Sequence, residues 1–487
     1  MAEQEKSASS QDLSGKAAKG AVWSTIDRFG MMVLIFSVNL VLARLLTPAD
    51  FGIIGMLAIF MSVSQVFVDG GFGSALIQKK QPSQSDYSTV FYWNLMISIG
   101  LYICLFIISP WVGEFYRMPL LSSVLRGIGL TLIVSSVYTI QMTRLRKQMN
   151  FKKLAVCNLT SYFTGGLVGI GMAFNGFGVW SLVGMQIGYY SMGVVLLAVV
   201  TRWLPSWSFS KSTVKELFGF GGFILGANIL QEISKNIQGV VIGRKFSAAQ
   251  MGLYSQAHKF DSVTSNTLPL VVGQVMYPVF SELQFDKVRL AAALSKSVRL
   301  ISFLSFPLIG LLIIIAEPLI GLLYGDKWIP CTAYYRIFCI GGFFTTLINI
   351  NFYVVAALGY SKTLFKWSFY KWGFLLTGIL VGMNFGIDGI IWAVVLSNIN
   401  IYFVNSCLAC RQLGVSLISQ VKDWGRNMVI VFLSGIMAVG FSMVTGFSPW
   451  ISGLVFVIAF AVLVFFLNRD DFSQAKDISV RLLGKIR

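Results

Sequence analysis

Histidine is almost missing from this sequence of 487 residues, in which His258 is the only one. No histidine is left elsewhere in the chain for a Ser-His-Asp triad, a Cys-His pair or a histidine-based metal cluster. A phosphate-cradling G-x-x-x-x-G-K-[ST] loop is also missing, because the nearest string, GYSKT at 359–363, lacks the glycine spacing. These absences disfavour an enzyme and a transporter that hydrolyses ATP itself, and we expect no metal or organic cofactor.

Cysteine is sparse as well, with six residues that stand mostly singly in or near apolar segments. Such a distribution is not that of a disulfide framework. CLAC at 407–410 has the spacing of a redox or metal-ligand pair, but no second pair or histidine accompanies it. We interpret these cysteines as small packing residues.

Charged residues make up only 12% of the chain, against 56% hydrophobic residues and a mean hydropathy of +0.74. So much apolar surface cannot be buried in one soluble core. A helix crosses the hydrocarbon in about 20 residues, and its backbone groups must be satisfied internally. The sequence therefore predicts an all-α polytopic membrane protein with about 14 transmembrane helices. Their approximate centres are residues 33, 60, 100, 132, 165, 189, 227, 265, 305, 343, 372, 398, 435 and 457.

The net charge of +18 would, in a soluble protein, suggest a nucleic-acid partner. With a cytoplasmic N-terminus, about 25 Lys and Arg residues fall in the tails and even-numbered loops, and about 5 fall in the others. This asymmetry predicts that both termini are cytoplasmic and that the basic loop at 144–153 touches anionic lipid. Residues 1–19 lack the pattern of a signal peptide and are expected to form a cytoplasmic tail. We expect no nucleic-acid partner.

Two stretches about 200 residues apart repeat one pattern, ARLLTPADFGI at 43–53 and IGRKFSAAQMGL at 242–253. A second echo links FNGFGVWSLV at 174–183 to FGIDGIIWAVV at 385–395. The repetition predicts a duplicated unit of six helices, whose two copies have parallel topology because six is even. We expect a tail (1–19), an N-lobe (20–205), a C-lobe (206–412), and two further helices with a basic cytoplasmic tail (413–487).

Polar side chains inside the apolar helices are the candidates for a functional site, since such groups are costly in lipid. NILQEISKNIQ at 228–238 would place six of them on one helical arc of about 160°. They are Asn228, Gln231, Glu232, Lys235, Asn236 and Gln238. Glu232 and Lys235 are three residues apart and are expected to form an ion pair.

Charged residues in other predicted helices extend this set. The cations are Arg28, Lys259, Arg336, Lys366 and Lys371, and the acids are Asp27, Asp69 and Asp261. Together with Lys235 and Glu232 they favour a polar, mildly cationic cavity suited to an anionic headgroup. For each residue alone, an interhelical pair or a side chain that snorkels to the interface is the alternative.

Four strings in the chain carry a family resemblance: WSTIDRFG at 23–30, RKQMNFKKL at 146–154, YPVFSEL at 277–283 and AEPLIGLLYGDKW at 316–328. Across residues 18 to 412, approximately, the sequence resembles the bacterial polysaccharide exporters. These are the Wzx-type lipid-linked oligosaccharide flippases, including the colanic and teichuronic acid exporter branch. They belong to the superfamily of the multidrug and toxin extruders and the peptidoglycan precursor flippase. The matching residues are mostly packing and loop residues, so they do not identify the sugar.

This resemblance implies two lobes around a central cavity of alternating access, with lateral portals lined by the first and seventh helices. Its implied cargo is an undecaprenyl-diphosphate-linked oligosaccharide, flipped across the bacterial inner membrane for O-antigen, capsule or exopolysaccharide. A polysaccharide polymerase and a chain-length regulator are the protein partners that such an exporter would meet. The expected substrate contacts are Arg28, Lys235 and Arg336, followed by Lys259, Lys366, Lys371, Asn228 and Gln231. Coupling to protons or sodium would use Asp27, Asp69 or Glu232, with help from the membrane potential.

Several alternatives stay open at this stage. A multidrug or cation antiporter of the same superfamily would line its cavity with aromatic and acidic residues, and a peptidoglycan precursor flippase would carry a related lipid. A membrane glycosyltransferase or polymerase would need a long catalytic loop, whereas the longest connection expected here, at about 69–88, has no pair of carboxylates. A purely structural scaffold would not need the polar arc at 228–238.

Overall fold

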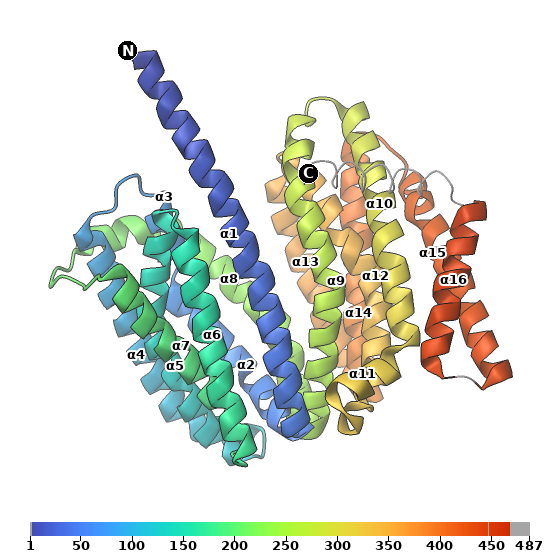
Figure 1. The fold of residues 1–487 in the computed structure, drawn as a ribbon, viewed down its shortest axis with the longest axis horizontal. Coiled ribbons are helices and arrows are strands. Elements are labelled where there is room, and N and C mark those ends of the chain that lie inside the picture. Colours follow the sequence, from blue (N-terminus) through green and yellow to red (C-terminus); the bar gives the residue numbers. More distant parts are fainter. Residues whose placement is uncertain (1, 447, 468–487) are drawn as a thin grey trace. The chain divides into compact units, whose positions relative to one another are not determined.

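The structure is a computed structural model that describes the backbone of residues 2–446 and 448–467 and the side chains of most of them. This part of the chain holds sixteen α-helices, two short 3-10 turns and no strand. The helices are α1 (Ala2–Leu45), α2 (Pro48–Asp69), α3 (Phe72–Gln78), α4 (Gln84–Phe115), α5 (Leu120–Lys147), α6 (Phe151–Phe174), α7 (Trp180–Thr201), α8 (Lys211–Lys245), α9 (Ala248–Glu282), α10 (Lys287–Ile314), α11 (Ala316–Tyr324), α12 (Cys331–Ala357), α13 (Ser361–Gly382), α14 (Gly386–Leu413), α15 (Leu417–Thr445) and α16 (Pro449–Leu467). Figure 1 labels most of these helices.

The all-α prediction is confirmed, and each predicted helix centre lies inside a helix. Two of the sixteen helices, α3 with 7 residues and α11 with 9, are too short to cross a membrane. Eleven segments of the described residues are long and apolar enough to span it, and one of them, Lys362–Leu413, contains nearly all of α13 and the whole of α14. The chain is therefore a multi-pass membrane protein, and the predicted count of about 14 spans stays approximate.

The chain divides into two compact units, Met1–Gly252 and Leu253–Arg487. In unit 1, α1 packs on α6, α6 on α7, α5 on both α4 and α7, and α2 on α8. In unit 2, α12 packs on α14 and α10, α13 on α14, and α15 on α10 and α16. The α15–α16 hairpin, red in Figure 1, comes last in the described chain. The expected division into lobes at residue 205 falls in the linker between α7 and α8 and remains a prediction.

The repeated sequence motif forms the same local structure twice. Thr47 caps α2 by accepting a hydrogen bond from the Asp50 backbone N–H, while the Asp50 carboxylate accepts one from the Thr47 N–H at 2.9 Å. Ser247 and Gln250 repeat this reciprocal arrangement before α9, with backbone N–H bonds of 3.1 and 3.3 Å. Both are capping boxes, in which two otherwise unpaired N–H groups at a helix start are satisfied. The two copies of the sequence motif therefore form the same capping structure at the starts of two helices.

The glycine of each copy of the motif lies against the backbone of the other copy, within unit 1. A Cβ built at Gly52 would overlap the carbonyl oxygen of Ala248, and one at Gly252 would overlap that of Pro48. Only glycine permits backbones to approach so closely. The start of α2 and the first turn of α9 thus meet through a reciprocal glycine contact.

Glycines also bring α6 and α7 together. A Cβ at Gly165 would lie 2.6 Å from the Met185 carbonyl oxygen and 2.7 Å from the Tyr189 nitrogen. Gly165 and Gly169, both in the string GGLVG at 165–169, thus allow the backbones of α6 and α7 to pack closely. This packing brings the tyrosines of α7 up against α6.

The connection expected at about 69–88 is shorter than the sequence suggests. The 7 residues of α3 lie within it, and this helix begins after two glycines with positive φ, Gly70 and Gly71. Only residues 79–83 remain as a loop before Ser83 caps α4. Lys147, at the end of α5, donates to the carbonyl oxygens of Ile77 and Lys79 and holds this loop in place.

Candidate functional site

The polar arc of α8 contains the ion pair that the sequence predicts. Lys235 Nζ lies 2.8 Å from Glu232 Oε1, and the lysine side chain is 55% exposed. Asn236 Nδ2 donates to the Glu232 backbone oxygen at 2.9 Å and to Ser62 Oγ of α2 at 3.1 Å. Glu232 is thereby held close to the contact with α2, whereas the ammonium group of Lys235 reaches outward.

The other polar side chains of the α8 arc differ in their exposure. Asn228 and Gln231 are exposed, whereas Gln238 is buried. Leu230 and Ile233, from the apolar side of the helix, are also exposed. This part of α8 therefore presents both polar and apolar surface.

The acid on α1 belongs to a network that connects four helices of unit 1. Asp27 Oδ1 accepts a hydrogen bond from Asn158 Nδ2 of α6 at 3.0 Å. The Asn158 Oδ1 atom accepts from the hydroxyl groups of Tyr138 of α5 and Tyr189 of α7, each at 3.0 Å. These two bonds orient the amide so that its NH₂ group points to Asp27. The next residue on α1, Arg28, is exposed.

Four tyrosines surround this network, and we call them the tyrosine cluster: Tyr138, Tyr162, Tyr189 and Tyr190. Tyr189 lies at the centre, with ring centroids 5.6 Å from Tyr162 and 5.7 Å from Tyr138. Gly193 makes room for Tyr138, because a Cβ there would lie 2.6 Å from the Tyr138 ring. A carboxylate, an amide and phenol groups together can hold a proton or a small cation such as sodium.

Sequence reasoning identified Asp27 but missed its partners. Asn158 was visible in the sequence only within NLT, a pattern of glycosylation acceptors that is meaningless inside a helix. It lies 131 residues from Asp27, so no local spacing connects them. The Tyr189-Tyr190 doublet in an apolar helix was the one available signal.

A further candidate acid of unit 1 lies at the end of a different helix, α2. Asp69 is the last residue of α2, is exposed, and accepts a hydrogen bond from Gln65 Nε2 at 3.1 Å. Gln65 in turn accepts one from Ser135 of α5 at 3.0 Å. Asp69 thus ends a short polar chain between α2 and α5.

Among the candidate cations of unit 2, Arg336 and Lys371 make contacts between helices. Arg336 Nε donates to the carbonyl oxygen of Ile313 at 3.2 Å, and its Nη2 lies 3.9 Å from Glu317 Oε2. Lys371 Nζ donates to Asn405 Oδ1 at 2.6 Å. These contacts resemble the interhelical alternative set out above.

The remaining two cations, Lys259 and Lys366, are exposed on α9 and α13. Asp261, also on α9, accepts a hydrogen bond from Ser265 at 2.6 Å. Within the described residues, no group of three or more His, Cys, Asp or Glu side chains could hold a metal ion. The candidate cations thus lie in both units. That they line one common cavity remains a prediction from the sequence.

A comparison of the sequence with family models matches residues 41–333 to a family described as "Polysaccharide biosynthesis protein". Among curated proteins, the teichuronic acid biosynthesis protein TuaB of Bacillus subtilis is 23% identical over 431 residues, covering 88% of this chain and 89% of TuaB. The lipopolysaccharide biosynthesis protein WzxC of Escherichia coli is 21% identical and covers 75% of each chain.

Among solved structures, the lipid II flippase MurJ in an inward closed conformation has a TM-score of 0.73 at 13% identity. The alignment covers 93% of this chain and 99% of MurJ. At this identity the likeness shows the fold alone. Because the family model matches more than half of the chain, this multi-pass membrane protein with a MurJ-like fold belongs to the family of polysaccharide biosynthesis proteins.

Proposed function

We propose that the protein flips undecaprenyl-diphosphate-linked oligosaccharides from the cytoplasmic to the outer face of the bacterial inner membrane. The family and the names of the relatives support a role in making a surface polysaccharide, and the fold supports a flippase. A diphosphate sugar chain cannot cross hydrocarbon unaided, whereas its polyprenyl tail is at home there. Alternating access would move the headgroup through the protein while the tail stays in lipid.

The observation that carries the substrate class is the exposed polar surface of α8, a helix of a strongly apolar protein. Lys235 offers a cation, and Asn228 and Gln231 offer amide groups suited to sugar hydroxyls. Arg28 on α1 offers a planar guanidinium that fits phosphate in a bidentate manner. In our proposal Arg28, Lys235 and Arg336 are the leading phosphate contacts, with Lys259, Lys366 and Lys371 as further cations.

The energy of transport has two proposed sources. An inside-negative potential contributes about 2.3 kcal/mol per 100 mV for each negative charge that moves outward. The network around Asp27 would add coupling, because gain or loss of a proton or sodium ion there changes the hydrogen bonds among α1, α5, α6 and α7. Asp69 and Glu232 are the less favoured coupling sites, because each carboxylate is engaged by neighbours on its own helix, Gln65 for Asp69 and Lys235 and Asn236 for Glu232.

The test is translocation of a labelled undecaprenyl-diphosphate oligosaccharide in liposomes that contain the purified protein. Arg28→Ala and Lys235→Ala should each slow headgroup movement at least tenfold. The control Lys80→Ala, which removes an exposed cation from the loop before α4, should leave the rate unchanged. Equal rates for all four proteins would refute the assigned contacts. No movement by the wild type, with movement of lipid II in parallel liposomes, would make the protein a peptidoglycan precursor flippase.

A second candidate function, export of organic cations, is favoured by one observation. The tyrosine cluster beside Asp27 combines aromatic rings with a carboxylate, a combination that attracts cations. Uptake of a cationic dye into the same liposomes under an imposed proton gradient separates the two functions. Dye exchange that Asp27→Asn abolishes, without any movement of lipid-linked sugar, would replace the flippase proposal.

A further inference from the structure

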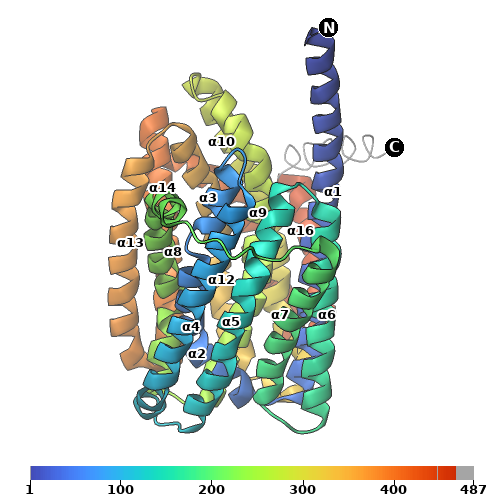
Figure 2. The same cartoon turned by 90° about the vertical axis from the view of Figure 1, so that its left-hand side faces the viewer.

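The linker between α7 and α8, residues 202–210, is bound tightly to the start of α4. Trp203 Nε1 donates to Gln84 Oε1 at 2.7 Å, and Gln84 Nε2 donates to the Leu204 carbonyl oxygen at 2.8 Å. The Ser206 N–H donates to Ser88 Oγ at 2.9 Å. Figure 2 shows the linker running from α7 to α8 across the helices of unit 1. Its backbone is thus fixed at the start of α4.

Although it is fixed, the linker exposes large apolar side chains. Leu204 is 79% exposed, Trp207 is 98% exposed and Phe209 is 48% exposed. Trp207 stacks on Tyr92 of α4, with ring centroids 6.1 Å apart. Ordered aromatic side chains that face outward near the end of a spanning helix are typical of the membrane interface, where one end is apolar and the other wet. This surface of unit 1 therefore fits the headgroup level of a bilayer.

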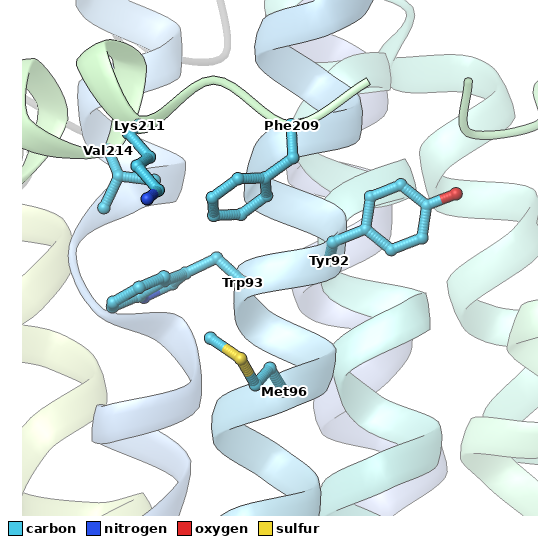
Figure 3. A pocket seen from close by; sticks show the side chains of 6 residues that line it. All are labelled: Tyr92, Trp93, Met96, Phe209, Lys211 and Val214. Carbon is cyan, nitrogen blue, oxygen red and sulfur yellow. The ribbon is translucent and has the colours of Figure 1, made fainter. Parts of the chain in front are cut away.

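Next to the linker lies an open cavity of about 520 Å³. It is lined by Tyr92, Trp93, Met96, Phe209, Lys211 and Val214. In Figure 3, Phe209 and Lys211 lie on one side of the Trp93 ring and Met96 on the other, while the Tyr92 hydroxyl points away from the rest. One cationic group thus stands at the mouth of a cavity with otherwise apolar walls.

The charge at this cavity is positive and available. Lys211 is exposed, and no ion pair among the described residues includes it. Lys215, one helical turn further along α8, is also exposed and adds a second cation on the same face. The nearest carboxylate on α4, Asp86, is paired with Lys79 at 3.2 Å and accepts a hydrogen bond from Thr213. The electrostatic field at the cavity therefore favours an anion.

The side chains that line the cavity suit one class of ligand better than others. A sugar would need many hydrogen-bonding side chains, and a nucleotide would need several cations around its phosphates. An amphiphile with one anionic group and an acyl chain needs one cation and apolar walls, and aromatic rings at the interface suit it. We propose that this cavity is a binding site for a phospholipid with an anionic headgroup, with Lys211 at the phosphate and Trp93 and Met96 along the acyl chain. The site is separate from the proposed cargo contacts.

The test is native mass spectrometry of the full-length protein in detergent, titrated with phosphatidylglycerol and, in parallel, with zwitterionic phosphatidylcholine. Lys211→Gln should weaken the tightest phosphatidylglycerol binding about fivefold, the factor expected for one interfacial lysine. Its control is Lys80→Gln, which removes an exposed cation that does not line the cavity. Met96→Trp should narrow the cavity and weaken binding while every charge is kept. Its control is Met443→Trp on α15, where the side chain is 82% exposed.

The outcomes distinguish the occupant and do not depend on transport. Weaker binding in Lys211→Gln and Met96→Trp but not in their controls, with little binding of phosphatidylcholine, supports the site. Equal binding of both lipids, or wild-type affinity in both cavity variants, overturns it. Undecaprenyl phosphate that binds more tightly than phosphatidylglycerol, with the same dependence on Lys211, would also overturn it by making the occupant the carrier lipid. Melting temperatures within 2 °C of wild type, approximately, are required of each variant, so that misfolding does not imitate lost binding.

Discussion

Replacement of Gly52 by alanine adds one methyl group at the place where the start of α2 meets the first turn of α9. The new Cβ would overlap the carbonyl oxygen of Ala248, which belongs to the backbone and cannot move aside by a change of rotamer. The two backbones must therefore separate, and the capping boxes on either side must shift with them. Overpacking of this kind costs about 1–3 kcal/mol in soluble cores.

The helix propensity of alanine works in the opposite direction and returns about 1 kcal/mol relative to glycine. We expect Gly52→Ala to lower the free energy of unfolding by up to about 2 kcal/mol. For a unit of 252 residues this corresponds to a melting temperature lower by up to about 8 °C. Gly100→Ala in α4 is the matched control, because a Cβ there has no atom within 4 Å. The Gly100→Ala variant gains the helix propensity of alanine without a steric overlap, so it should melt at or slightly above the wild-type temperature.

The assay is thermal unfolding of the purified protein in one detergent at one scan rate, since such unfolding is often irreversible. The reciprocal variant Gly252→Ala should behave like Gly52→Ala. The double variant should lose less than the sum of the two, because backbones that have separated for one methyl group already make room for the other. Identical melting of Gly52→Ala and Gly100→Ala, or full additivity in the double variant, would refute the reciprocal contact.

Two further predictions concern polar contacts inside each unit. Asp423→Asn removes the carboxylate that lies 2.7 Å from Arg299 and is only 8% exposed, so we expect a loss of about 1–3 kcal/mol. Asp286→Asn breaks an exposed pair and should cost less than about 0.5 kcal/mol in the same melting assay. Asn158→Leu leaves two tyrosine hydroxyls without their acceptor and Asp27 without its donor, and should cost about 1–3 kcal/mol. A melting temperature equal to that of wild type would show that water replaces the amide.

The positions of the helices were predictable because lipid imposes a local rule on the chain. A segment that crosses hydrocarbon must be apolar for about 20 residues and must satisfy its own backbone, so each span is visible in its own sequence. The starts of α2 and α9 were equally visible, since a capping box is formed by residues three apart. The pairing of Glu232 with Lys235 was predictable for the same reason.

The candidate site was only half predictable. Asp27 and Lys235 were visible as costly charges in apolar helices, yet their surroundings depend on contacts between distant segments. Nothing in the sequence indicated that Arg336 lies beside Glu317 or that Lys371 donates a hydrogen bond to Asn405. Charge in a helix reveals that a partner or water is needed, but not which of the two is present.

The sequence by itself determined the class of protein, the order of its helices and the repeat, because hydropathy, capping and periodicity act within a few residues. Only the tertiary structure decided that Asn158 holds Asp27 across 131 residues, that the linker is bound to α4, and that a cavity forms beside Trp93. The same is true of the contact between Gly52 and Gly252, whose pairing was visible as a repeat but not as a contact. These features arise where helices pack side by side, and packing depends on the shapes of surfaces that the chain brings together only when it folds.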